Sequence, residues 1–295
     1  MAKSNLTEAQ AIERSSLLKI DSYQIHIDVT DNAGESSVKT FHSTTTVKFS
    51  SRKIGDSSWI ELIASKIHRA VLNDIELDIT SYSEEKGLTL PNLAMENVLT
   101  IEADCDYSNT GKGLHRFVDP ADDKIYLYTH FEPADAKRVF ACFDQPDLKA
   151  VYQLTVTAPE SWKVLSNTET ASTELVETGA KRHFFNETKP LSTYLVALIA
   201  GEYAEWRDEY KGIPLGLYCR ASLAEHFDTE RLFLETKQGF DFFHEKFKID
   251  YPFDKYDQCF VPEFSSAAME NAGCVTFTDM YVFRSRMTDL AYEYR

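Results

Sequence analysis

Apolar and polar residues alternate in many short segments of the first 205 residues, and this period of two constrains the fold more than any other feature of the sequence. In the segment 23–29, Tyr, Ile, Ile and Val occupy every second position. Such alternation is typical of strands that bury one face. It recurs in the segments 41–49, 75–79, 99–103, 125–128 and 152–156, and the segment 194–200 is continuously apolar. No helical period separates these strands, so the sequence predicts a mainly β region, an antiparallel saddle-like sandwich.

The period changes after about residue 206. Apolar or uncharged residues then recur every three or four positions, at Leu232, Thr236, Phe240, Phe243 and Phe247. With Asp228 ahead of them as an N-cap, they predict an amphipathic helix over 229–248. Near the start, Thr7 and Gln10 have the spacing of a helical capping box. We therefore expect two domains, 1–205 and 206–295, of which the second is the start of an α+β domain.

The charge balance and the cysteines bound the partners and the compartment. Asp and Glu number 47 against 31 Lys and Arg, a formal charge of −16, which disfavours nucleic acids and anionic membrane surfaces as partners. No apolar run approaches the ~20 residues of a membrane span, and the first residues lack the apolar stretch of a signal peptide. Five cysteines without a CxxC spacing favour reduced thiols. Together these features predict a cytoplasmic protein.

Two short motifs resemble functional signatures without completing them. Gly111-Lys112-Gly113 lacks the further glycines and the Lys-Ser/Thr pair of a phosphate-binding loop, so we expect a turn. His244-Glu245 begins like a zinc-binding HExxH, but Lys248 stands where the second histidine would be. The remaining histidines have no recognisable ligand spacing. The sequence thus shows no complete metal site.

Two other stretches are rich in aromatic, proline and carboxylate residues beside apolar strands. The first covers residues 126–150 and includes His130 and Glu132, and the second covers residues 261–273 and includes Glu263 and Glu270. Two interpretations remain open from the residues alone. The carboxylates either form buried structural ion pairs or receive a cationic ligand at the ends of loops.

The second stretch contains Ala267-Ala268-Met269-Glu270-Asn271, which resembles the Gly-Ala-Met-Glu-Asn exopeptidase motif of the aminopeptidase N family of zinc metallopeptidases. The first resembles the segment of that family's N-terminal domain that contributes a second acidic residue to the substrate pocket. The similarity is strongest to actinobacterial-type members and includes the segments 113–117 and 281–285. It implies a β N-terminal domain followed by a thermolysin-like catalytic domain.

The resemblance also implies roles for individual residues. Glu270 would bind the free α-ammonium of a peptide, and Glu132 would assist it. Backbone groups of Ala267 and Ala268 would align the scissile peptide, with Met269 and Asn271 completing the motif, and His130 would face the first side-chain pocket. Paired carboxylates that hold a terminal ammonium leave no room for preceding residues, so the expected reaction removes one N-terminal residue at a time in peptide catabolism.

The sequence departs from the family's pattern at two positions. The family usually has Gly at the position of Ala267 and Gln at that of His130. Glycine permits backbone conformations and close approaches that a Cβ hinders, and a histidine can carry a positive charge in mildly acidic solution, next to the substrate ammonium. We therefore expect reduced or pH-sensitive substrate affinity relative to typical members.

The family binds one zinc ion through His-Glu-x-x-His and a later Glu, and the Glu of that motif acts as general base on zinc-bound water. These residues are expected beyond Arg295, so no catalytic or metal-ligating residue is assigned to this chain. The chain is then the substrate-recognition part of an aminopeptidase, inactive without the C-terminal part of its own protein. The main alternative is a noncatalytic scaffold of the same fold. A relative that also opens an epoxide cannot be separated from a plain aminopeptidase by these residues.

Overall fold

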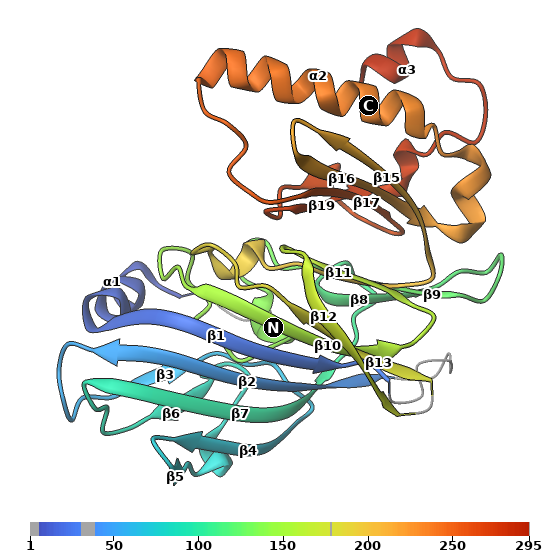
Figure 1. Cartoon of the computed structure of the whole chain (residues 1–295). Helices are drawn as coiled ribbons and strands as arrows, with labels where there is room; N and C mark the ends of the chain where they lie inside the picture. Colours follow the sequence, from blue (N-terminus) through green and yellow to red (C-terminus); the bar gives the residue numbers. More distant parts are fainter. Residues whose placement is uncertain (1–5, 31–38, 178, 295) are drawn as a thin grey trace.

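The structure, a computed structural model, describes residues 6–30, 39–177 and 179–294 and consists of stacked layers (Figure 1). An eight-stranded sheet packs against a four-stranded sheet, which in turn packs against a five-stranded sheet. Helix α2 (Thr229–Phe247) covers the far face of the five-stranded sheet. The described residues therefore form three apolar cores, one between each pair of neighbouring layers.

The eight-stranded sheet contains most of the alternating segments. In spatial order its strands are β12 (Thr170–Glu177), β13 (Ala180–Phe185), β10 (Val151–Pro159), β1 (Leu18–Asp28), β2 (Thr40–Ser51), β7 (Glu96–Asp106), β4 (Lys66–Leu72) and β5 (Ile75–Glu76). Neighbouring strands are antiparallel except β1 and β10, which run parallel with Tyr23 opposite Tyr152. One face is buried and the other faces solvent, as the period of two predicts.

The four-stranded sheet is buried on both faces. Its order is β11 (Lys163–Ser166), β14 (Leu198–Gly201), β9 (Ile125–His130) and β8 (Gly113–Val118). Along β9, Leu127 packs into the core beneath the eight-stranded sheet, whereas Tyr126 and Tyr128 pack into the core toward the five-stranded sheet. Burial on both sides explains why β9 and β14 contain almost only apolar and aromatic residues.

The five-stranded sheet begins the second part of the chain. Its order is β15 (Tyr203–Tyr210), β16 (Ile213–Arg220), β17 (Tyr256–Val261), β19 (Cys274–Thr278) and β18 (Ala268–Met269). The pairs β16–β17 and β17–β19 are parallel, and β18 returns antiparallel to β19 as the edge strand. The domain boundary predicted after residue 205 falls inside β15 and stays a prediction.

The helices begin and end close to where the sequence places them. Helix α1 (Glu8–Leu17) has the capping box of Thr7 and Gln10. The predicted helix 229–248 is α2, which begins after Asp228 and ends where Lys248 adopts a left-handed conformation with φ 55°. The remaining short elements are α3 (Asp289–Glu293), the strand pair β3 (Ser58–Ile60) and β6 (Leu88–Leu90), and 3-10 turns at Ile79–Ser81, Ala136–Arg138, Thr193–Leu195, Ala221–His226 and Asp279–Tyr281.

Two predicted strands are shorter than the pattern suggests. Of the segment 75–79 only Ile75–Glu76 is a strand, because the Asp78 side chain accepts a hydrogen bond from the Thr80 amide (2.9 Å) and starts a 3-10 turn there. Of the segment 194–200, residues up to Leu195 form a 3-10 turn and the strand starts at Leu198. All five cysteines are buried and free. Among the described residues, no helix is both long and apolar enough to cross a membrane.

Candidate functional site

The two stretches singled out in the sequence meet in space, although more than a hundred residues separate them. The loop after β17 lies against β9. There Phe264 contacts the His130 ring, with centroids 4.9 Å apart, and meets Tyr128 edge-on at 5.6 Å. Phe264 and Met269 share a buried core with Tyr126 and Tyr128. The fold therefore places both stretches at one seam between the four-stranded and five-stranded sheets.

A pair of histidines fixes one side of this seam around Gly111. The Gly111 amide donates to Nδ1 of the buried His115 (3.1 Å), and its carbonyl accepts from Nδ1 of His130 (2.9 Å). Because Nδ1 of His115 is an acceptor, Nε2 carries the proton and donates it to the Glu263 carboxylate (3.1 Å). Burial lowers the pKa of His115, although the nearby Glu263 carboxylate opposes this shift. The neutral imidazole thus connects β8 to the loop that follows β17.

Glu270 lies at the exposed tip of the turn that joins β18 to β19. The turn is closed by Gly273, whose φ is 72° and where a Cβ would lie only 2.2 Å from the Asn167 carbonyl oxygen. The Asn167 side chain holds the same turn by donating to the Ala272 carbonyl (2.9 Å). From the other side, the ammonium of the buried Lys255 donates to the Gly273 carbonyl (2.9 Å). A firmly anchored turn therefore presents Glu270.

The residues before Glu270 form the edge of the five-stranded sheet. The Ala267 carbonyl accepts from the Thr278 amide (3.1 Å), and Ala268 pairs with Phe277. Both alanines are exposed, whereas Met269 is buried. Ala267 is not among the residues with positive φ, so this backbone conformation does not require glycine. Since β18 is an edge strand, its outer backbone groups can pair with an added extended peptide.

Glu132 lies just beyond the end of β9, on the opposite side of the seam. It follows the buried Phe131 and is itself exposed, as is Glu270. Within the part of the chain that the structure describes, no hydrogen bond or ion pair involves either carboxylate. The structure therefore brings the segments of both glutamates to one seam without joining the two side chains to each other or to a basic residue.

Buried polar atoms accompany this seam. The Asn271 side-chain amide nitrogen, the Tyr128 hydroxyl and the Thr276 hydroxyl are buried without a hydrogen-bond partner among the described residues. Thr276 is the register partner of Met269, so these atoms lie beneath the motif that contains Glu270. Buried polar groups are usually hydrogen-bonded. These three atoms are exceptions to that rule among the described residues.

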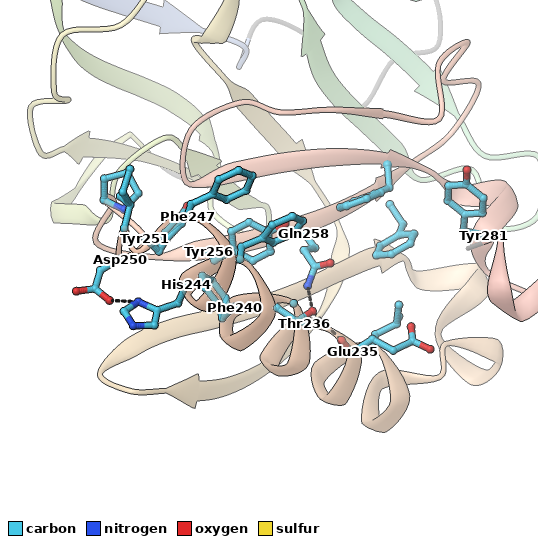
Figure 2. A pocket seen from close by; sticks show the side chains of 17 residues that line it. Glu235, Thr236, Phe240, His244, Phe247, Asp250, Tyr251, Tyr256, Gln258 and Tyr281 are labelled. Carbon is cyan, nitrogen blue, oxygen red and sulfur yellow. Dashed lines mark hydrogen bonds and ion pairs between the residues drawn. The ribbon is translucent and has the colours of Figure 1, made fainter.

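A cavity of about 600 Å³ lies elsewhere, between α2 and the five-stranded sheet (Figure 2). Phe240, Phe243, Phe247 and Tyr256 line it, and the Gln258 side chain, which donates to the Thr236 hydroxyl (2.8 Å), lies at its base. None of the residues assigned to peptide recognition lines this cavity. The candidate site is therefore an exposed seam, and the apolar cavity belongs to the other face of the sheet.

The candidate site does not provide a set of metal ligands. Among the described residues, one group of His, Cys, Asp or Glu side chains has converging ligand atoms, namely His42, His68 and Asp104 on the eight-stranded sheet. None of the assigned site residues belongs to it. The zinc ion that the resemblance implies therefore does not fit the described residues around Glu270.

Comparison with known protein families identifies the family of this chain. Residues 19–195 match the Peptidase M1 N-terminal domain, and residues 233–292 match the Peptidase family M1 domain. The chain belongs to the M1 peptidase family. Its sequence is 49% identical to Aminopeptidase N of Streptomyces lividans over 300 residues, covering 100% of this chain and 34% of that protein. The predicted membership of the aminopeptidase N family, actinobacterial type, is confirmed, and so is the predicted fold class.

More distant M1 relatives match shorter parts of the chain. Probable M1 family aminopeptidase 1 of Encephalitozoon cuniculi is 40% identical over 187 residues, covering 61% of this chain and 21% of that protein. Glutamyl aminopeptidase of Homo sapiens is 34% identical over 171 residues, covering 58% of this chain and 17% of that protein. This chain thus spans about a third of the length of Aminopeptidase N of Streptomyces lividans, to which all of it can be aligned.

Sequence reasoning assigned no role to three residues that build the candidate site. His115 and Glu263 connect the two sheets, and Asn167 anchors the turn that presents Glu270. His115 stands in a segment quoted for the family resemblance, but its spacing indicates no partner. The Asn167 contact joins residues 105 positions apart, and no local pattern in the sequence predicts it.

Proposed function

We propose that this chain is the substrate-recognition part of a zinc-dependent M1 aminopeptidase that removes single N-terminal residues from peptides, acting in the cytoplasm. The main support for the proposal is the contact between the two stretches of the sequence that contain Glu132 and Glu270, at the seam between the four-stranded and five-stranded sheets. Both carboxylates are exposed there, and Glu270 lies next to the edge strand β18. The names of the relatives support the same activity.

The described residues would bind and orient the substrate. A peptide that pairs with the outer edge of β18 lies along Ala267 and Ala268, and its free ammonium then reaches Glu270 at the turn. A carboxylate that accepts hydrogen bonds from an ammonium forms a charge-assisted contact. Glu132 adds a second negative charge from the β9 side, while Met269 and Asn271 hold the strand and turn from below. Because the turn is anchored before substrate arrives, little ordering opposes binding.

The chemical step requires a component that these residues do not supply. In metallopeptidases a zinc ion provides the activated water, and the described residues offer no ligand set for it at this site. Ammonium binding supplies orientation but no attacking group. We therefore propose that the zinc ligands belong to a further part of the parent protein, beyond Arg295 and outside the described residues. The chain alone is then inactive, and that C-terminal part is its partner.

Peptide binding tests the recognition role on the chain itself. Titration with alanyl-alanine amide, followed by two-dimensional NMR, should show binding that is lost on N-acetylation of the peptide, because acetylation removes the ammonium charge. Glu270→Gln should weaken binding by at least about tenfold, the order expected for a charged hydrogen bond. Glu225→Gln, a change of another exposed glutamate, is the matched control. Equal binding of the free and acetylated peptides would contradict the proposal.

Hydrolysis tests the assignment of chemistry. The purified chain should not hydrolyse an alanyl chromogenic substrate, with or without bound zinc, whereas the complete parent protein should hydrolyse it in a chelator-sensitive reaction. Chelator-sensitive turnover by the 295-residue chain alone would contradict the proposal that the zinc ligands belong to another part of the parent protein. Reading the coding sequence past codon 295 gives an independent check. HExxH within the next few codons supports the enzyme, and a stop codon supports a noncatalytic scaffold.

The two departures from the family pattern have their own test. His130 donates from Nδ1 to the Gly111 carbonyl (2.9 Å), which holds the ring beside the site. In the complete enzyme, Ala267→Gly combined with His130→Gln should lower the Michaelis constant and flatten its pH dependence. An unchanged Michaelis constant would show that these departures do not affect affinity.

A further inference from the structure

Three adjacent strands of the eight-stranded sheet carry His42, Asp104 and His68. His42 on β2 stands directly opposite Asp104 on β7, and β4, which carries His68, pairs with the other side of β7 (Figure 1). The chain neighbours Phe41 and Cys105 are buried. Since side chains alternate along a strand, His42 and Asp104 project from the solvent-facing side of the sheet.

A β-bulge brings His68 to the same place. The pairing of β4 with β7 shifts between Ile67 and Arg69, which leaves His68 as the extra residue. Burial along β4 shows the same irregularity, because His68 and Arg69 are both exposed where strict alternation would turn one of them inward. Bulges often re-aim a side chain next to functional sites. Here the imidazole of His68 is aimed at Asp104.

The donor atoms of the three side chains converge. Nδ1 of His42 lies 3.1 Å from Oδ1 of Asp104, and Nε2 of His68 lies 2.7 Å from Oδ2. One ligand atom from each residue lies within 4.8 Å of the other two. Zinc binds nitrogen and oxygen at about 2.0–2.2 Å, which places neighbouring ligand atoms of a tetrahedral site roughly 3.3 Å apart. Small side-chain rotations therefore suffice to hold one ion.

The hydrogen bonding of the His42 ring and the exposure of the three side chains are also compatible with a cation. The Thr44 hydroxyl lies 3.4 Å from Nε2 of His42, where it can accept the remaining ring proton once Nδ1 binds a metal. The His42, His68 and Asp104 side chains are 36%, 33% and 33% exposed, so an ion can enter from solvent.

We propose that His42, His68 and Asp104 form a binding site for a divalent transition-metal ion, with Zn²⁺ as the best match to two imidazoles and one carboxylate. Water completes the coordination on the open side. The overall charge of −16 attracts cations to the surface. A bound ion connects β2, β7 and β4 and so stabilises the part of the sheet that ends at the edge strand β5.

Metal titration of the untagged 295-residue chain tests this site. Isothermal titration calorimetry with ZnCl₂ should show one equivalent bound with a micromolar dissociation constant, and Co²⁺ should give the visible absorption of a nitrogen-ligated ion. His68→Ala and Asp104→Asn should each weaken binding by at least about tenfold. Zn²⁺ should raise the midpoint of thermal unfolding of the original chain and leave that of both variants unchanged.

His244→Ala is the matched control. His244 is also exposed and lies 2.8 Å from a carboxylate, that of Asp250, but no second imidazole joins this pair in the described residues. This variant should bind Zn²⁺ as the original chain does. If a variant of the triad fails to fold by circular dichroism, His42→Gln replaces it with a polar side chain of similar length. The proposal is overturned by the absence of saturable binding, by equal binding in all variants, or by millimolar binding that reveals only adventitious sites.

Discussion

A phenylalanine of the eight-stranded sheet and two near the end of helix α2 have opposite surroundings. Phe49 on β2 is 1% exposed and meets the Phe143 ring edge-on at 5.2 Å, whereas Phe243 and Phe247 on α2 are 57% and 66% exposed. The β region closes its core between two sheets, while α2 covers one sheet along part of its length and leaves an apolar cavity beside it. The same residue type therefore contributes to stability only where a second layer covers it.

The two longest helices differ in the same way. Arg14 of α1 is completely buried and binds both oxygens of Glu61, at 2.6 and 2.7 Å. Arg231 of α2 is 42% exposed, and it pairs with Glu235 one turn later. A buried ion pair is costly to break because one charge is left without its partner, whereas an exposed pair is screened by water. A buried ion pair thus connects helix α1 to the β region.

Replacing phenylalanines should show the largest contrast. Phe49→Ala should lower the free energy of unfolding by about 3–5 kcal/mol, because it removes a fully buried ring from a packed core. Phe247→Ala should lower it by less than about 1 kcal/mol, since surface substitutions rarely cost more. Urea unfolding followed by circular dichroism measures both. Equal losses would mean that α2 is covered in solution by a surface that is absent from this structure.

Replacing the two helical arginines sharpens the comparison. Arg14→Met should lower the free energy of unfolding by about 3 kcal/mol, because Glu61 loses its buried partner. Arg231→Met should cost about 1 kcal/mol or less, from an exposed pair and a ring contact with Tyr292 at 4.2 Å. The same unfolding experiment applies, repeated at high salt. High salt should reduce the loss of stability caused by the Arg231 change and leave the loss caused by the Arg14 change nearly unaltered. The reverse result would contradict a buried Arg14 and an exposed Arg231.

The smallest effect concerns pH at the seam between the two regions. The pKa of His115 is lowered in the folded chain, so the unfolded chain binds more protons below the unfolded value of about 6.5. The stability from the neutral imidazole is therefore complete above this value and is lost as the pH falls through the folded pKa. His115→Gln retains an acceptor for Gly111 and a donor for Glu263 but does not titrate.

The measurement for this prediction is a difference between two proteins. The free energy of unfolding of the original chain should fall more steeply between about pH 6.5 and pH 5 than that of His115→Gln. Burial also lowers the pKa values of His26 and His183, and these contributions cancel in the difference. Identical pH dependence in both proteins would show that His115 is not held in its neutral form.

The elements of the fold follow largely from local patterns. The period of two places β2, β7 and β10, and the period near four places α2 to within one residue of its end. The pattern does not indicate which strands become neighbours, so the parallel pairing of β1 with β10 is not predictable from it. It also overextends the segment after Ile75, where the capping bond of Asp78 competes with the strand.

The candidate site could be predicted in part. The motif around Glu270 and the segment of Glu132 are visible in the sequence, and the fold brings them to one seam. Their support is not visible, because it depends on contacts between distant segments. His115 reaches Glu263 across 148 positions, and the bulge that turns His68 toward Asp104 depends on register between strands. Local patterns carry no information on either contact.

Asn167 has a consequence for how this protein can change. Its side-chain amide donates to the carbonyls of Leu195 (2.8 Å) and Ala272 (2.9 Å), and its oxygen accepts from the Ala197 amide (2.9 Å). One side chain of the β region thus fixes the position of the turn that carries Glu270. The position of that carboxylate therefore depends on the β region. When this region is exchanged between relatives, the position is preserved only if residue 167 and its three partners are transferred together.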